Sequence, residues 1–175
     1  IKNSPPQVGA VYSKLEKVLA NGKKIIYPPK TLRKASGNLH QALLEKNFIT
    51  LQTSLIRKEC FDKLGGFDEN LTALSDWDFW IRFSAHFNFM HLPETFTIAK
   101  VMPDSITKNQ KKRLLGREII FHKHFDEFKK YPRIFAKHSY TLGHTFAMQG
   151  EIDKAKKYLW EGLKTYPLHI KIWMA

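Results

Sequence analysis

The side chains best suited to acid–base chemistry are two aspartates, Asp76 and Asp78, in an aromatic-rich segment whose spacing predicts a helix. Asp78 has Arg82 four residues further on, on the same helix face, where the two charges would pair. Asp76 has only Phe79 and Trp80 at the corresponding positions, so no cation of the helix would neutralise it. A carboxylate beside aromatic rings at a helix start is a reasonable general base. Asp76 is therefore the candidate catalytic residue.

A purely structural explanation of these residues stays open. Ser75 is a typical N-cap residue, and Asp78, three residues later, would complete a capping pair. Carboxylates in the first turn also meet the positive end of the helix dipole. On this interpretation the aspartates stabilise the start of the helix, and Ser75, Asp78 and Arg82 serve as structural support.

A glycine pair and two tryptophans lie close to the aspartates in the sequence. Gly65 and Gly66 would end a helix over residues 58–64 and would let the backbone approach a bound ligand. Trp77 and Trp80 would stack on a ring of a bound ligand or, as is more common at helical spacing, pack in the core. We assign ligand contacts to these four residues and expect at least one of the two indoles to be buried.

A change of pattern near residue 108 divides the chain into two predicted domains, residues 1–108 and 109–175. Short β-branched runs alternate with short helical segments before this point, and only helical periodicity follows it. The turn signal Asn21-Gly22 predicts a hairpin. We expect an α/β part, with a partial mixed sheet and helices, followed by an all-α helical hairpin. The expected strands cover residues 8–12, 24–27, 48–56, 87–91 and 95–102, and the expected helices cover 38–46, 58–64, 75–86 and 111–128.

Composition excludes several classes of protein. The chain of 175 residues has one cysteine, Cys60, which excludes an internal disulfide and multi-cysteine zinc sites. No glycine-rich phosphate loop and no apolar run of membrane length occurs. His122 and His124 are two apart on a predicted helix and point to different faces, so we predict no metal site in this chain.

The formal net charge of +13 is concentrated in two basic flanks around an acidic middle, residues 47–107. A basic surface attracts the phosphates of nucleic acids, anionic lipids or nucleotides. The acidic middle argues against nucleic acid, because a nucleic-acid reader concentrates positive charge on the element that makes contact. An anionic membrane surface stays open as a partner, and we expect a cytoplasmic protein, either free or peripheral at the membrane.

Residues 1–108 resemble the acceptor-side half of a family 2 glycosyltransferase of the GT-A fold. Residues 8–13 (VGAVYS) resemble a strand of that fold, and residues 55–69, ending in GGFDE, resemble its "RRxxF…GGFDE" segment. Residues 75–82 (SDWDFWIR) resemble the family's "EDWDLWLR" helix, and residues 37–49 resemble its acceptor-side stretch. The resemblance rests on the order and spacing of all these segments.

The resemblance implies inverting transfer of a sugar from a nucleotide-sugar donor to the hydroxyl of a saccharide or lipid-linked acceptor, with Asp76 as the base. The ligand that Gly65, Gly66, Trp77 and Trp80 contact would then be the acceptor and its sugar ring. It also implies a divalent cation, Mg²⁺ or Mn²⁺, in the full-length enzyme. Ser75 replaces the family's glutamate and Met102 a frequent histidine, so no metal role is carried over. Because the donor-binding Asp-x-Asp segment is not in this chain, we expect the fragment to bind no cation and to be inactive alone. The alternative is a non-catalytic interaction module with a degenerate α/β half.

Residues 136–169 resemble a tetratricopeptide repeat. One repeat cannot bury its own apolar face, so we expect the helix over residues 111–128 to pack on it, and Gly143 and Ala155 to lie where two antiparallel helices touch. The repeat is either a partner-binding groove or a support for the catalytic domain. The second interpretation is favoured, because solenoid binding surfaces need several repeats. The residues that carry the resemblance are Leu142, Gly143, Phe146, Gly150, Ala155, Leu159 and Pro167.

Overall fold

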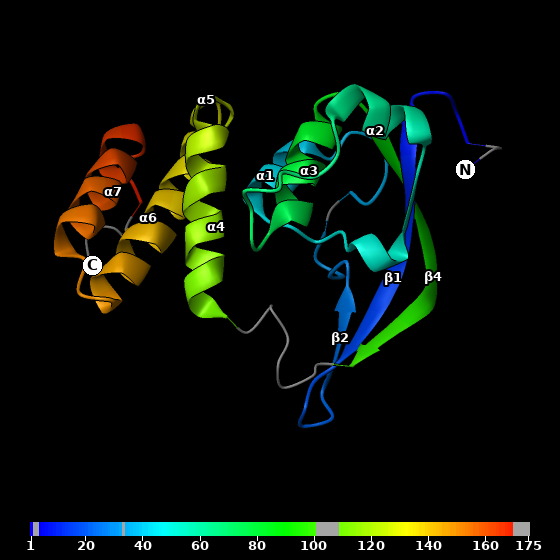
Figure 1. The fold of residues 1–175 in the computed structure, drawn as a ribbon, viewed down its shortest axis with the longest axis horizontal. Helices are drawn as coiled ribbons and strands as arrows, with labels where there is room; N and C mark the ends of the chain where they lie inside the picture. Colours follow the sequence, from blue (N-terminus) through cyan, green and yellow to red (C-terminus); the bar gives the residue numbers. More distant parts are fainter. Residues whose placement is uncertain (2–3, 33, 101–108, 170–175) are drawn as a thin grey trace. The chain divides into compact units, whose positions relative to one another are not determined.

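The computed structural model describes residues 1, 4–32, 34–100 and 109–169 (Figure 1). Contacts within the chain divide it into two units. The first comprises Ile1–Asn70 and Leu74–Lys108, and the second comprises Leu71–Ala73 and Asn109–Ala175. The second unit thus takes three residues from the part that we expected to form the first domain.

A small mixed sheet forms one side of the first unit. Its central strand, β1 (Val8–Val18), pairs antiparallel with β2 (Lys24–Tyr27) and β3 (Ser54–Ile56), and parallel with β4 (Asn88–Lys100). The predicted hairpin at Asn21-Gly22 is confirmed. Gly22 has a φ of 76°, which favours glycine, and the Asn21 side chain accepts a hydrogen bond from the N–H of Lys23.

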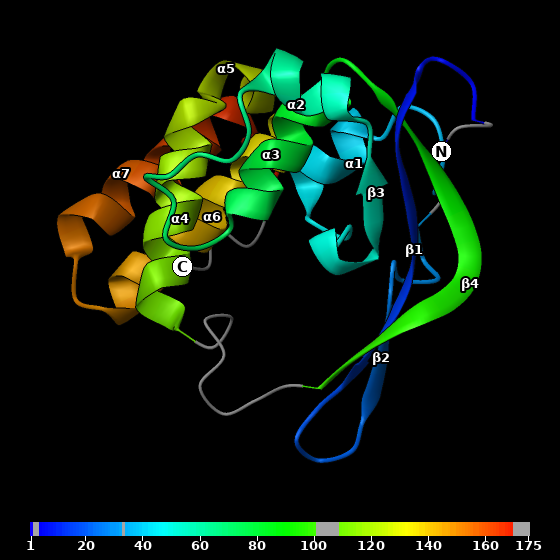
Figure 2. The ribbon, with the colours of Figure 1, turned by 45° about the vertical axis from the view of Figure 1, so that its right-hand side comes forward.

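Three short helices pack on one face of this sheet: α1 (His40–Glu45), α2 (Lys58–Leu64) and α3 (Ser75–Ser84) (Figures 1 and 2). Aromatic side chains fill the space between sheet and helices. Tyr12 and Phe89 come from the strands, and Phe79, Trp80 and Phe83 come from α3. The aromatic run of α3 is therefore the centre of the core, and its burial fixes the position of the helix start.

Two strand predictions were wrong. Residues 48–56 do not form one strand, because the segment forms a 3₁₀ turn, η1 (Leu51–Thr53), before the short β3. The Thr53 and Ser54 hydroxyls both donate to the carbonyl oxygen of Thr50, which offers the backbone an alternative to a strand. The two strands expected over residues 87–91 and 95–102 are one strand as far as Lys100, beyond which the expected end lies outside the described residues.

Pro93 lies within that continuous strand. Ser13 of β1 pairs with Leu92 and the next residue, Lys14, pairs with Thr95, so Pro93 and Glu94 fall in a register shift. A proline is tolerated there because a bulge needs no ladder hydrogen bond from it.

The described residues from 109 to 169 contain helices and no strand, as predicted. They form α4 (Gln110–Lys123), α5 (Phe125–Lys129), α6 (Pro132–Met148) and α7 (Ile152–Thr165). The helix expected over residues 111–128 is divided in two at His124. Aromatic rings form the core of this unit, and they are contributed by Phe121, Phe128, Phe135, Phe146 and Tyr158.

The predicted contact at Gly143 and Ala155 is confirmed. A Cβ atom placed on Gly143 of α6 would lie 2.7 Å from Leu159 Cγ and 3.0 Å from the carbonyl oxygen of Ala155, both in α7. A side chain at position 143 would require the Leu159 side chain or the α7 backbone at Ala155 to shift.

We expect Gly143→Ala to lower the free energy of unfolding by about 1–2 kcal/mol, because the added methyl overpacks the α6–α7 contact. Helix propensity alone predicts the opposite sign, a gain of about 1 kcal/mol. Urea unfolding measures the change. In a Leu159→Ala background, which removes the closest side chain, the same substitution should cost less, and a stabilised Gly143→Ala variant would contradict the contact.

Candidate active site

The start of α3 differs from the prediction. The N-cap position is Leu74, which has a positive φ of 66° and no side-chain cap, and Ser75 is the first helical residue. The carbonyl oxygen of Leu74 accepts hydrogen bonds from the N–H groups of Trp77 and Asp78. The helix therefore begins one residue earlier than a Ser75 cap would allow, and the predicted capping pair of Ser75 and Asp78 was wrong.

The carboxylate of Asp76 lies at the first turn of α3 and is only partly buried. One oxygen, Oδ2, accepts a hydrogen bond of 2.9 Å from Nδ2 of Asn47. The other oxygen, Oδ1, accepts a bond of 2.9 Å from the backbone N–H of Trp77. An ionised carboxylate only accepts hydrogen bonds, and these two donors fix its orientation.

Asn47 is a site residue whose role sequence reasoning missed. It lies 29 residues before Asp76 and directly after α1, so no helical or strand spacing connects the two. Its side-chain oxygen accepts from the N–H of Ile49, which orients the amide with its NH₂ group toward Asp76. Only the resemblance to the glycosyltransferase segment drew attention to this position.

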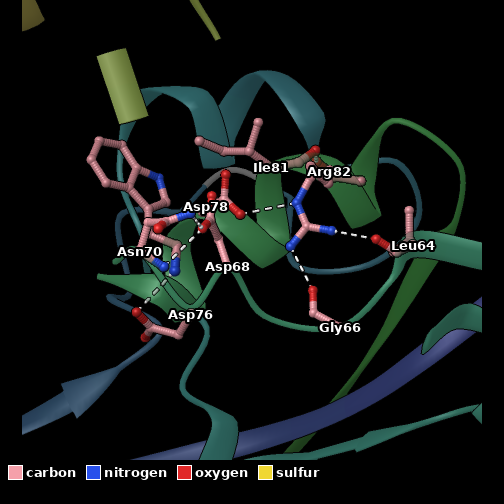
Figure 3. A network of polar contacts seen from close by, with 10 residues as sticks. Leu64, Gly66, Asp68, Asn70, Asp76, Asp78, Ile81 and Arg82 are labelled. Carbon is pink, nitrogen blue, oxygen red and sulfur yellow. Dashed lines mark hydrogen bonds and ion pairs between the residues drawn. The ribbon is translucent and has the colours of Figure 1, made fainter. Parts of the chain in front are cut away.

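Asp78 points into the protein and is 0% exposed. Its Oδ2 accepts a hydrogen bond of 2.9 Å from Nε of Arg82, which confirms the predicted pair four residues apart. The two outer nitrogens of Arg82 donate to the carbonyl oxygens of Leu64, at 2.8 Å, and Gly66, at 2.7 Å (Figure 3). The guanidinium group thereby ties α3 to the turn at the end of α2.

That turn is formed by the glycine pair. Gly65 ends α2 with a φ of 77° and donates its N–H to the carbonyl oxygen of Phe61, and Gly66 follows with a φ of 74°. The end of α2 at Leu64 is where the sequence predicted it. A Cβ atom on either glycine would meet nothing within 4 Å, so positive φ rather than lack of space favours glycine here.

The two tryptophans belong to the core, and we withdraw their assignment to acceptor contacts. Trp77 is 3% exposed and Trp80 is 0% exposed, so the expectation that at least one is buried is confirmed. Their indole N–H groups donate to the carbonyl oxygens of Leu43, at 2.6 Å, and Ile49, at 3.1 Å. An indole buried to this extent has no free face for a sugar ring.

Phe67 presents an aromatic ring beside the glycine turn instead. It is 40% exposed, and its ring packs against Phe61 and Phe79 with centroid distances of 6.0 and 4.9 Å. The loop continues to Asp68, whose carboxylate accepts from both the backbone and the side chain of Asn70 (Figure 3). The glycine turn is therefore bordered by one exposed ring and an ordered acidic loop.

Among the described residues, no group of three or more His, Cys, Asp or Glu side chains could hold a metal ion. His122 makes a hydrogen bond of 2.8 Å with the hydroxyl of Tyr158 in the second unit. The side chains around Asp76 thus do not fit a divalent cation.

Among the helices that the structure describes, none has the length and apolar character needed to cross a membrane.

Comparison with known families gives a match over most of the chain. A model described as glycosyltransferase like family 2 matches residues 18–161. The match begins at the end of β1 and runs into α7, past residue 108, where we expected the family resemblance to end. No curated protein matches the sequence.

We expect Arg82→Lys to lower the free energy of unfolding by about 2–3 kcal/mol, because lysine cannot hold Asp78 and both carbonyl oxygens with one planar group. The measurement is urea unfolding followed by far-UV circular dichroism. The matched control is Arg133→Lys at an exposed position of α6, which should stay within about 0.5 kcal/mol of the unmodified protein. Equal effects of the two substitutions would show that the Arg82 contacts do not stabilise the fold.

Proposed function

The chain belongs to the glycosyltransferase-like family 2, and from this premise we propose that it forms the acceptor side of an enzyme that transfers a sugar from a nucleotide-sugar donor to an acceptor hydroxyl. One observation carries the assignment of the base. Of the two aspartates in α3, Asp78 is buried in an ion pair with Arg82, whereas Asp76 is partly exposed and held by N–H donors. Asp76 is the carboxylate that an acceptor hydroxyl could reach.

The proposed reaction is an in-line displacement with inversion at the anomeric carbon. The acceptor oxygen forms a bond to that carbon while the bond to the nucleotide diphosphate breaks. Asp76 takes the proton of the acceptor hydroxyl as the new bond forms, and the diphosphate leaves with the bonding electron pair. Asn47 and the N–H of Trp77 keep the carboxylate in a fixed orientation throughout.

The proposed acceptor contacts are the glycine turn and the ring beside it. The space where a Cβ atom of Gly65 or Gly66 would stand is open to 4 Å, and the half-exposed ring of Phe67 could lie against a sugar. The acceptor is a saccharide or a lipid-linked saccharide. A divalent cation, Mg²⁺ or Mn²⁺, stays part of the proposal for the full-length enzyme, and no step above depends on it.

For the second unit we retain the proposal of a tetratricopeptide-like hairpin that supports the catalytic part. The close contact of α6 and α7 at Gly143 favours it, since small residues at helix crossings are typical of such repeats. The domain boundary near residue 108 and the cytoplasmic location stay predictions.

We expect Asp76→Asn in the full-length enzyme to lower turnover by about 10²–10⁴-fold, because asparagine keeps the size of aspartate but cannot accept a proton. Stability should change by less than about 1 kcal/mol, since the carboxylate is a partly exposed first-turn charge. Release of nucleoside diphosphate from a panel of nucleotide sugars measures turnover, and thermal unfolding measures stability.

The control for this experiment is Asp78→Asn, which should show the opposite balance. It removes the buried charge opposite Arg82, costing about 3 kcal/mol of stability, while activity at a temperature where the variant is folded falls far less. Near-normal turnover in Asp76→Asn would contradict the assignment of Asp76 as the base.

We further expect the 175-residue chain alone to release no nucleoside diphosphate from nucleotide sugars in the presence of acceptors. The sequence holds no phosphate loop, and its described residues hold no metal cluster to bind a donor diphosphate. The assay is the same, with the full-length enzyme as positive control. Turnover by the isolated chain would refute this expectation.

A further inference from the structure

An exposed tryptophan lies among lysines on the outer face of α7. Trp160 is 59% exposed, although tryptophan is usually well buried. Lys156 and Lys157 precede it by four and three residues and Lys164 follows it by four, so all three flank the ring on the same helix face. The Nζ atom of Lys164 lies 5.3 Å from the centroid of the indole ring. We call these four residues the Trp160 surface.

The opposite face of α7 already has its packing partners. Ala155, Tyr158 and Gly162 are buried, and Tyr158 stacks on Phe146 with a centroid distance of 5.6 Å. The core of the unit therefore does not need Trp160. The exposed ring is available for a binding partner.

The lysines of the Trp160 surface are available as well. In the part of the chain that the structure describes, Lys156 and Lys157 form no ion pair, whereas the neighbouring Lys154 lies 3.7 Å from the carboxylate of Glu151. No acidic residue occupies a position three or four residues from Trp160. The surface therefore combines one aromatic ring with a local excess of positive charge.

We propose that the Trp160 surface docks the protein on an anionic lipid membrane. Lysines attract the phosphates of anionic headgroups, and an indole ring inserts at the boundary between headgroups and acyl chains. Lysine stems are long and flexible, so the ammonium groups and the ring can engage one flat surface together. This inference goes beyond the proposed glycosyl transfer and does not depend on it.

A membrane fits this surface better than an acidic protein does. The ring stands on the convex face of a single helix, flanked by long side chains. A specific protein partner would have to supply a matching pocket for the ring and bury about 800 Å² on each side. A bilayer deforms around the ring and therefore needs no preformed pocket. The negative charge of its headgroups is complementary to the lysines.

The test measures binding of the full chain to phosphatidylcholine vesicles with and without phosphatidylglycerol, by cosedimentation. We expect binding only to the anionic vesicles, weakened by added salt because exposed charges are screened. Lys156→Glu with Lys157→Glu should weaken binding by at least about 10-fold. Trp160→Ala should weaken it by a similar factor, and circular dichroism should show that the variants are folded.

The matched control is Lys23→Glu with Lys30→Glu. Both residues are exposed and lie in the first unit, and this double substitution changes the formal net charge of +13 by the same amount. It should leave vesicle binding nearly unchanged. Equal losses in the two double variants would overturn the proposal, because net charge alone would then explain the binding.

A second readout follows the ring itself. Brominated acyl chains in the anionic vesicles should quench tryptophan fluorescence of the unmodified protein, and the quenching should be largely lost in Trp160→Phe. Both proteins carry Trp173→Phe, so that the remaining tryptophans besides position 160 are the buried Trp77 and Trp80. Quenching that persists in Trp160→Phe would then overturn insertion of this ring. Binding to poly-glutamate in solution that matches binding to the anionic vesicles would overturn the membrane as the partner.

Discussion

The buried ion pair between Asp78 and Arg82 is the contact on which the candidate site depends. A fully buried carboxylate is costly unless a cation and hydrogen bonds compensate it, and the guanidinium group provides both. The same group binds the carbonyl oxygens of Leu64 and Gly66, which terminate α2. One side chain therefore connects α3, the end of α2 and the glycine turn, and moving any of them would leave buried polar groups without partners.

This pair also separates the roles of the two aspartates. Asp78 is directed inward toward Arg82. Asp76, two positions earlier, points to a different face of the helix and is only partly buried. Asp76 is held there by an amide from Asn47 and by a backbone N–H, contacts that orient a carboxylate without burying it. The same turn of helix thus holds one buried, ion-paired aspartate and one partly exposed aspartate that accepts hydrogen bonds from N–H donors.

The elements predicted most accurately are those with local stop signals. β2 ends before Pro28-Pro29 and α2 ends before Gly65, because proline removes a backbone donor and a positive φ favours glycine. Residues 48–56 lack such a signal. Their apolar side chains indicate burial but not conformation, and hydroxyl groups that bond to the backbone decided it in favour of a 3₁₀ turn.

By itself the sequence determined the interactions that a helix brings together at fixed spacing, such as the pair Asp78–Arg82, and the helical character of the chain after residue 108 as far as it is described. The tertiary structure decided the rest. The contact of Asn47 with Asp76 joins positions 29 residues apart, and the buried indole N–H groups of Trp77 and Trp80 donate to carbonyl oxygens that lie 34 and 31 residues earlier in the chain. No periodicity encodes these contacts, because they form only when separate elements pack against one another.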